Sequence, residues 1–323
     1  MPSRRTFTLS IAALALARPP GAAAQAYPSR PIRVVVPYPP GGTTDVVARL
    51  VGGKLTEAWG QPVVVENKSG ALGMIGTEAG ARAAPDGYTL TLGNNSTHAA
   101  NAAMFDKPAI DLLRDVQPIA TAARSRHVLV VPVASPYRSM KELIDAGRQK
   151  SLTYASSSAG SASHLISETL RLRNQMNATH VPYRGVAPAA VDVISGQVDF
   201  MTATLGGVEQ YLQAGKLRAL AITGSNRHKA HPDLPSFKEL GFEYLDADAW
   251  FAFYAPAGTP RAIAEKLARE ITRIVGLPDV QDKLATAGFE PLVTGFDAIE
   301  AFHAREFQRW TEMVRTVGVK ASS

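Results

Sequence analysis

The sequence contains no cysteine, so disulfides, thiolate nucleophiles and cysteine-ligated metal sites are all excluded. It has no apolar run that could span a bilayer, which takes roughly 20 residues, and no tract of low complexity. A strong excess of charge is missing as well. Of the 34 basic residues, three (Arg4, Arg5 and Arg18) lie in the first 26 positions, which hold no acid, so the remainder carries 31 basic and 28 acidic residues. That balance is too even to favour nucleic acid as a partner.

The N-terminus has the parts of a secretory signal peptide. Arg4 and Arg5 precede an apolar stretch over 7–17, and small residues end in Ala-Gln-Ala at position 26. The apolar centre, about 11 residues, is too short to cross a membrane. The start resembles a twin-arginine export signal, and Arg18 after the apolar centre disfavours the ordinary route. We therefore expect residues 1–26 to be a cleaved signal peptide, with twin-arginine export favoured. The alternative is a disordered basic tail.

The body of the chain alternates strand-like and helix-like patterns. Runs rich in β-branched and aromatic residues occur at 32–36, 63–65, 88–92, 127–133, 152–155, 198–203, 217–223 and 251–255. Apolar residues with helical spacing follow most of them, at 45–59, 140–149, 164–173, 187–196 and 260–275. This alternation predicts an α/β fold in which helices cover both faces of parallel sheets. The length is enough for two such lobes.

The segment from Val34 to Leu55 predicts a strand, a tight turn and a helix. Two prolines end the strand, and Gly41 and Gly42 permit a turn that other residues could not make. Thr43 or Thr44 can cap the helix that follows. Backbone N–H groups and the positive end of the helix dipole would then face the carboxyl end of a strand, where an anion can bind.

Two further strand-to-helix junctions have the same design, and one of them is rich in serine. Neither the first junction nor the serine-rich one contains lysine or arginine, so their neutral donors suit a carboxylate held reversibly. The donors that we expect at the serine-rich junction are Ser156, Ser158, Gly160, Ser161 and Ser163, and those at the other are Ser96 and Thr97, beside Asn94 and Asn95.

Other motifs are weak. The Gly41-Gly42 turn lacks the spacing and the lysine of a P-loop, and the "GALGMIG" segment over 70–76 predicts an irregular helix start rather than a dinucleotide site. His228 and His231 could ligate a metal, but a solvated loop is the favoured interpretation. No G-x-S-x-G elbow occurs. Ser161 and His164 are three residues apart, and we expect a capping serine and a packed histidine rather than a catalytic pair.

The ordered set of motifs resembles the Bug family of extracytoplasmic receptors for tripartite tricarboxylate transporters. The stretches that carry the resemblance are "YPSRPIRVVVPYPPGGTTDVVARL", "ENKSGALGMIGTEAGARAAPDGYTL", "YASSSAGSASHL", "THVPYRGVAPAAVDVISGQVDFM" and "WFAFYAPAGTP". The resemblance extends over residues 27–323. It implies a two-lobed periplasmic binding protein fold of type II-like topology, α/β in each lobe, with a ligand cleft between the lobes. The implied division is 27–126 plus 250–323 for lobe 1 and 127–249 for lobe 2.

The resemblance also implies which loops hold the ligand. In the family, one loop from each lobe binds a carboxylate through backbone groups and ordered waters, and these loops correspond to Tyr38–Asp45 and Ser156–Ser163 here. Asp45 lies in the first helical turn, where it would interact with the dipole; the alternative is that it binds a water or a ligand ammonium group. Many relatives carry an acid after the strand at 198–203, whereas this chain continues with Thr202 and Thr204. That difference favours a plain carboxylate over an amino acid and leaves both threonines as candidate donors, or simply as the end of a strand.

Taken together, these features predict a periplasmic solute receptor, not an enzyme, that captures a small di- or tricarboxylate or an aromatic carboxylate for a tripartite transporter. We expect a monomer without cofactor or metal that meets membrane permease subunits. One alternative is a receptor that feeds a sensor kinase. The other is a secreted hydrolase using Ser158 or Ser161.

Overall fold

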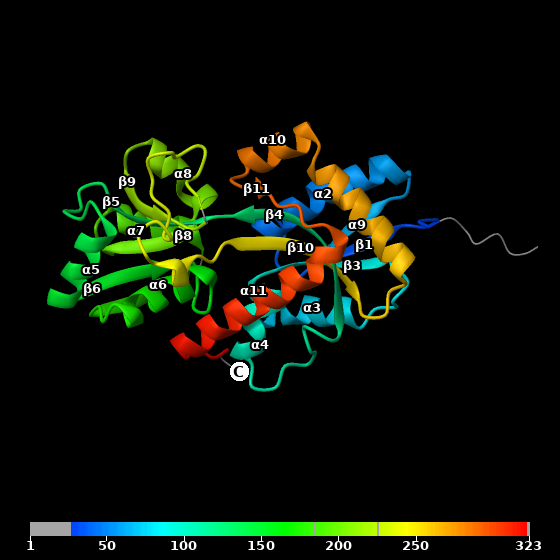
Figure 1. The fold of residues 1–323 in the computed structure, drawn as a ribbon, viewed down its shortest axis with the longest axis horizontal. Helices are drawn as coiled ribbons and strands as arrows, with labels where there is room; N and C mark the ends of the chain where they lie inside the picture. Colours follow the sequence, from blue (N-terminus) through cyan, green and yellow to red (C-terminus); the bar gives the residue numbers. More distant parts are fainter. Residues whose placement is uncertain (1–26, 184, 225, 322–323) are drawn as a thin grey trace, which may run out of the picture.

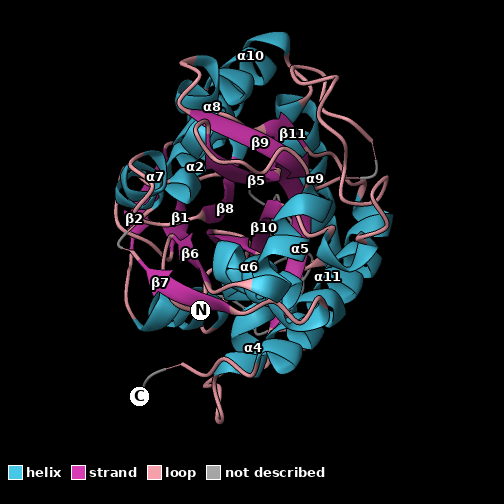
Figure 2. Cartoon of the chain, turned by 90° about the vertical axis from the view of Figure 1, so that its left-hand side faces the viewer, coloured by secondary structure: helices cyan, strands magenta, loops and turns pink. Residues whose placement is uncertain are grey.

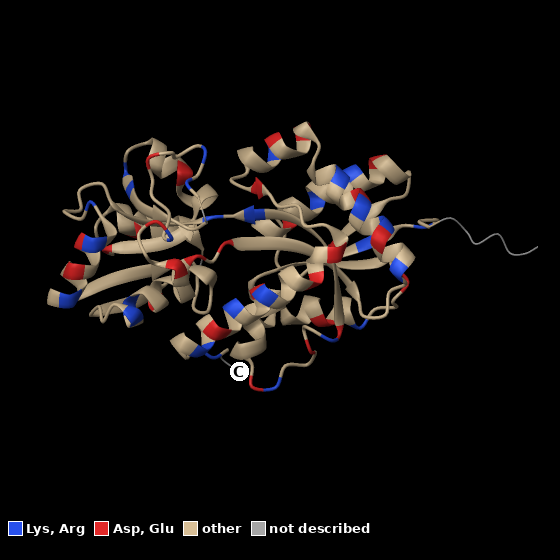
Figure 3. Cartoon of the chain, viewed as in Figure 1, with Lys and Arg blue, Asp and Glu red and all other residues tan. Residues whose placement is uncertain are grey.

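The computed structural model describes residues 27–183, 185–224 and 226–321, so the predicted signal peptide lies outside the described residues. The molecule is elongated and has two halves, each built on one β-sheet with helices on both sides (Figures 1 and 2). Among the described residues, no helix combines the length and the hydrophobicity that a membrane crossing requires. Basic and acidic residues are interspersed along the chain in both halves (Figure 3).

The first sheet has six strands in the order β11-β4-β10-β3-β1-β2. In Figure 1, α2, α9 and α10 lie above this sheet, and α3, α4 and α11 lie below it. Its strands are β1 (Ile32–Val36), β2 (Val63–Asn67), β3 (Thr89–Asn94), β4 (Val116–Ser125), β10 (Ala249–Pro256) and β11 (Glu290–Pro291). Its helices are α2 (Thr43–Trp59), α3 (Met74–Ala81), α4 (Asn101–Met104), α9 (Arg261–Val275), α10 (Pro278–Thr286) and α11 (Phe296–Val317), with short helical turns η2 (Ala71–Gly73) and η3 (Ser96–Ala100).

The second sheet has five strands in the order β7-β6-β8-β5-β9. One face packs against α5 and α6, and the other packs against α7 and α8. The strands are β5 (His127–Pro132), β6 (Leu152–Ser156), β7 (Ala178–Pro182), β8 (Phe200–Thr204) and β9 (Leu217–Ile222). The helices are α5 (Met140–Gln149), α6 (Ala162–Arg173), α7 (Val186–Ile194) and α8 (Leu205–Gln213), and η4 (Glu243–Leu245) precedes the return to the first sheet.

Both sheets are mixed, which corrects the prediction of parallel sheets. β1 pairs in parallel with β2 and β3, and β6 pairs in parallel with β7 and β8. By contrast, β10 runs antiparallel to β3 and β4, and β5 runs antiparallel to β8 and β9. β5 and β10 are the strands by which the chain enters one sheet from the other. Each runs antiparallel to both of its neighbours in the sheet that it enters.

An ionic cluster lies where the chain passes from β4 to β5. Glu290 of β11 accepts a hydrogen bond from Arg124 Nη2 at 2.6 Å. Arg126 Nε and His228 Nε2 form ion pairs with the same carboxylate, at 2.7 Å and 3.0 Å. Arg126 is 4% exposed, and it also donates to Asn226 O at 2.5 Å. This carboxylate therefore ties both halves of the molecule together beside the crossover.

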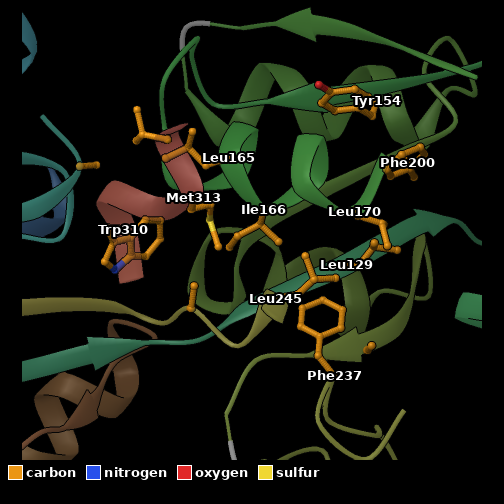
Figure 4. Close-up of a cluster of buried hydrophobic side chains, with 14 of the residues drawn as sticks. Leu129, Tyr154, Leu165, Ile166, Leu170, Phe200, Phe237, Leu245, Trp310 and Met313 are labelled. Carbon is orange, nitrogen blue, oxygen red and sulfur yellow. The ribbon is translucent and has the colours of Figure 1, made fainter. Parts of the chain in front are cut away.

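The two halves share one hydrophobic cluster. Trp310 and Met313 of α11 pack toward Leu165 and Ile166 of α6, and the cluster continues to Phe200 of the second sheet (Figure 4). Beyond α11, the chain end lies beside α4, and Ala321 N donates to Met104 O at 3.0 Å. A helix that follows the first sheet in sequence thus completes the core of the second.

Candidate functional site

The first predicted loop leaves the start of α2 without a side-chain cap. Gly42 is the N-cap residue, with φ −78° and ψ 171°, and no side chain accepts a hydrogen bond from the first turn. The prediction that Thr43 or Thr44 caps the helix is therefore wrong, because both already lie inside it. The first backbone N–H groups of a helix have no partner within it. Those of Thr43 and Thr44 remain as donors for an anion.

Asp45 braces the loop from behind. Its side chain is 3% exposed. Oδ2 accepts hydrogen bonds from Gly41 N and Arg49 Nε, both at 2.9 Å, and Oδ1 accepts one from Asn67 Nδ2 at 2.9 Å. Burial alone would raise the pKa of this carboxyl, but the hydrogen bonds from Arg49, Gly41 and Asn67 hold the pKa below its ordinary value. Asp45 therefore orders the turn, and the Gly41 N–H is already used within the loop.

The serine-rich loop is also braced, largely by its own hydroxyls. Ser161 is the N-cap of α6, and its Oγ accepts His164 N at 3.3 Å and donates to Ser158 O at 2.6 Å. Ser163 Oγ accepts Ser157 N at 3.1 Å. Gly160 N donates to His164 Nδ1 at 3.0 Å. Unlike the first loop, this one therefore reaches the cavity with a capped helix.

The third junction is organised by one amide. Asn94 Oδ1 accepts three hydrogen bonds, from Tyr38 Oη at 3.2 Å, Ser96 N at 3.0 Å and Thr97 N at 3.1 Å. Burial raises the pKa of Tyr38 to about 12, so its hydroxyl keeps its proton. Because Oδ1 is occupied by donors from the protein, the Nδ2 of Asn94 is the part of this amide left for a ligand.

The three junctions meet at a cavity of about 660 Å³ between the two sheets. Nine of the predicted residues line it: Tyr38, Gly41, Gly42, Thr43, Thr44, Ser96, Ser158, Gly160 and Ser161. The wall also contains residues that were not predicted as site residues: Pro39, Pro40, Leu72, Asn94, Asn101, Ser157, Ala159 and Gly185. Among the described residues, no charged side chain lines this cavity.

Six predicted residues do not line the cavity, and packing explains each. Asp45 faces Arg49 and Asn67, as described above, and Ser163 holds Ser157. Thr97 and Ser156 are fully buried behind their loops, where Ser156 Oγ lies 2.7 Å from His180 Nε2. Thr202 is fully buried on central strand β8 and accepts Ser167 Oγ at 2.9 Å. Thr204 is the N-cap position of α8. These residues support the site or end a strand.

The additional lining residues differ in how clearly the sequence indicated them. Pro39, Pro40, Ser157 and Ala159 stand inside the predicted loops, and Asn94 and Asn101 belong to the stretch over 91–101 that forms the third junction. Leu72 and Gly185 lie outside these stretches and approach the cavity only through the tertiary fold.

A larger groove of about 990 Å³ lies between α5 and residues 230–242. Three of its charged side chains pair with one another: Lys141 Nζ lies 2.6 Å from Asp145, and Arg148 Nη1 lies 3.7 Å from the same carboxylate. None of the three junctions contributes to this groove within the described residues. The smaller cavity is therefore the better candidate for ligand binding, in spite of its size.

The predicted serine nucleophiles are not paired with a histidine at the cavity. Ser161 Oγ contacts Ser158 O and Ser163 Oγ, and His164 uses its Nδ1 for Gly160 N. The rings of His164 and His180 stack at 3.8 Å, and burial, followed by the charge of His180, lowers the pKa of His164 to about 4. The contact between Ser156 and His180 is buried behind the loop. This geometry braces a loop and does not activate a hydroxyl.

The loop that carries His228 and His231 is largely exposed, as the sequence predicted, although the two imidazole rings are partly covered. They are 17% and 23% exposed and lie 3.0 Å from Glu290 and 2.9 Å from Glu209, respectively. Over the part of the chain that the structure describes, no three His, Asp or Glu side chains gather as a metal site would require.

Comparison with known proteins agrees with this architecture. The chain is 37% identical over 300 residues to BugT of Bordetella pertussis, a match that covers 92% of each protein. The solved structure of the periplasmic binding protein BugD is similar, with a TM-score of 0.76 and 31% identity over 91% of this chain and 99% of that one. Two structures with bound acids are also similar. R. palustris Rpa4515 with adipate has a TM-score of 0.79 and 32% identity, over 91% of this chain and 99% of that one. MatC of Rhodopseudomonas palustris with bound malate has a TM-score of 0.73 and 32% identity, over 89% of this chain and 100% of that one.

The family model named "Tripartite tricarboxylate transporter family receptor" matches residues 47–319, which include most of both sheets. The predicted fold class is confirmed by the two sheets flanked by helices and by the periplasmic binding proteins that resemble them. The chain belongs to the tripartite tricarboxylate transporter receptor family and is a solute-binding protein of that family.

Proposed function

We propose that this receptor captures a small carboxylate in the cavity between its two sheets and presents it to membrane permease subunits. The observation that carries the proposal is the uncapped N-terminus of α2 in a cavity whose described lining residues carry no charged side chain. Backbone N–H groups at a helix start favour an anion. Neutral donors release a carboxylate more readily than a buried arginine would, because they form no ion pair with it.

The relatives indicate the size of the ligand. Rpa4515 was solved with adipate and MatC with malate, and a cavity of about 660 Å³ has room for acids of this size. We infer a plain carboxylate rather than an amino acid, because the one acid of the two loops, Asp45, is committed to Gly41, Arg49 and Asn67.

Ligand capture would involve closure of two lobes, 27–126 plus 250–323 and 127–249. β4 ends at Ser125, β5 begins at His127 and β10 begins at Ala249, so these bounds divide the chain at its two crossovers. Each lobe would then supply one loop to the ligand. We further propose that the receptor acts as a monomer and that the leader is cleaved after Ala26 on a twin-arginine route. A sensor protein reading the same closure is the alternative partner.

A receptor should return its ligand unchanged, and we propose that this protein is not an enzyme. The contacts of Ser161 support this, since its Oγ bonds to Ser158 O and Ser163 Oγ rather than to a histidine ring of the described residues. Incubation with an ester panel should release no product.

Calorimetry on ligand-stripped protein tests the proposed function. Succinate, malate, glutarate, adipate, citrate, glutamate and nicotinate form the panel, with melting curves alongside. At least one plain acid should bind and raise the melting temperature, because a ligand that binds only the folded state stabilises it. Binding of glutamate alone would contradict the preference for a plain carboxylate, and binding of no acid would refute carboxylate capture.

A further inference from the structure

Leu72 occupies an unusual place for a leucine. It lines the cavity, it is 44% exposed, and it belongs to none of the hydrophobic clusters among the described residues. Single exposed apolar residues are common on protein surfaces and need no explanation. Leu72 differs from these because its backbone conformation is one that leucine disfavours.

Leu72 has φ 54° and ψ 28°, and Ala71 before it has φ 46°. Both lie in the left-handed region, where the Cβ of an L-residue comes too close to the following carbonyl oxygen. Glycine or asparagine would adopt this conformation at lower cost. Conformations of this kind persist where the surrounding structure enforces them, and they are concentrated at ligand-binding positions.

The surroundings of Leu72 do enforce it. Asn101, which is 1% exposed, donates its Nδ2 to Leu72 O at 3.0 Å, and Gly73 N donates to Gly70 O at 2.8 Å. A Cβ at Gly73 would come within 2.6 Å of Thr97 Cγ2, so the turn is seated directly against the third junction of the site. The backbone of Leu72 is therefore fixed at the cavity wall by these contacts.

We propose that Leu72 is a specificity-determining residue that contacts the apolar body of the bound acid. This role of Leu72 rests on the proposed function, because the apolar body of the acid would lie in the same cavity as its carboxylate. Among the described residues, the wall offers hydroxyls, amides and backbone groups for a carboxylate, but few apolar surfaces. The others are the ring of Tyr38 and the side chains of Pro39, Pro40 and Ala159, all within the two loops. Leu72 is the largest aliphatic side chain in the wall and comes from a different segment.

A contact with Leu72 should make binding affinity depend on the length of the ligand. Each methylene that contacts Leu72 should improve binding, whereas the shortest acids, held only by their carboxylates, should not sense this residue. The ligand class is therefore a carboxylate with a methylene chain or ring, and hydroxylated acids of equal length should bind less well.

Calorimetry with two homologous series tests this on the full mature chain: succinate, glutarate and adipate, and butyrate, pentanoate and hexanoate. The variants are Leu72→Ala, which truncates the side chain, and Leu72→Asn, which keeps its approximate shape and suits the left-handed backbone but is polar. The control is Leu113→Ala, at a leucine that is 50% exposed and outside the cavity. Melting curves show that each variant is folded.

In whichever series binds, both Leu72 variants should weaken binding of the six-carbon acid by about tenfold and that of the four-carbon acid by less than about twofold. The control should bind both like the wild type. Equal losses for short and long acids, or no loss, would overturn the role of Leu72 while leaving carboxylate capture intact. Failure of the wild type to bind any acid of either series or of the panel above would overturn both.

Discussion

A side-chain cap added at Gly42 should stabilise the protein and weaken its ligand binding at the same time. Gly42 has the backbone conformation of an ordinary N-cap residue, and a Cβ there would lie 3.7 Å from Pro39 O, an ordinary contact. In Gly42→Asp the new carboxylate would accept hydrogen bonds from the first turn of α2. It would occupy the donors that we assign to the ligand, and its charge would repel an incoming anion.

The size of the effect follows from the number of donors removed. Hydrogen bonds to a charged group contribute about 1.5–3 kcal/mol each. Losing one of them should weaken carboxylate binding by roughly 10- to 150-fold, and losing two by a larger factor. Aspartate exceeds glycine as an N-cap by only a few tenths of a kcal/mol, so the melting temperature of the free protein should rise by about 1 °C. Gly42→Ser, which caps without charge, should have a smaller effect on affinity.

The fold provides a matched control at Gly295. This glycine is the N-cap of α11, has φ −61° and ψ 154°, lacks a side-chain cap and has nothing within 4 Å of a built Cβ. Gly295→Asp should bring the same small gain in stability and no change in affinity. Calorimetry and melting curves on both variants make the comparison. Should Gly42→Asp bind its acid as tightly as Gly295→Asp does, the helix start of α2 is not the carboxylate site.

Three other substitutions test the supports of the site. Ser161→Ala removes the cap of α6, so it should lower stability by about 1 kcal/mol in urea unfolding and weaken binding about tenfold; unchanged binding would exclude this loop. Glu290→Ala leaves Arg126 buried without its carboxylate, so the free energy of unfolding should fall by about 2 kcal/mol, less than for a fully buried ion pair. A decrease below about 0.5 kcal/mol would mean that the ionic cluster does not stabilise the fold. His164 has a pKa of about 4 when folded, against an ordinary value near 6.5. Unfolding then takes up protons between these values, so stability should fall by up to about 3 kcal/mol from pH 6.5 to pH 4, and His164→Gln should show a shallower slope.

Local patterns predicted the elements that carry strong periodicity. The strand prediction at 32–36 matches β1, and those at 152–155 and 217–223 agree with β6 and β9 to within one residue. β4 was missed because its sequence, Val116–Ser125, contains three alanines and a proline and lacks strand propensity. It forms a strand because it is buried between β10 and the α9 and α11 helices, where small side chains allow close packing.

The loops that line the candidate cavity were predictable where chain-local chemistry defines them. Paired glycines and clustered serines at strand ends identified both loops, although which hydroxyls face the cavity depended on hydrogen bonds inside each loop. Ser163 turns toward Ser157, a choice that spacing alone does not reveal. Leu72 could not be predicted, because its place on the wall depends on Asn101, which is 29 residues away in the chain.

The packing of α11 on α6 has a consequence for the order in which the protein folds. The side chains of Leu165 and Ile166 belong to the middle of the chain, but their cover, Trp310 and Met313, is synthesised about 145 residues later. Until the ribosome has released α11, the middle segment exposes an apolar surface to which chaperones could bind. Folding from the N-terminus onward, one lobe after the other, would thus stall. A nascent chain arrested before α11 should be protease-sensitive throughout its second sheet, and the last helix should convert the whole molecule to a resistant state in a single step.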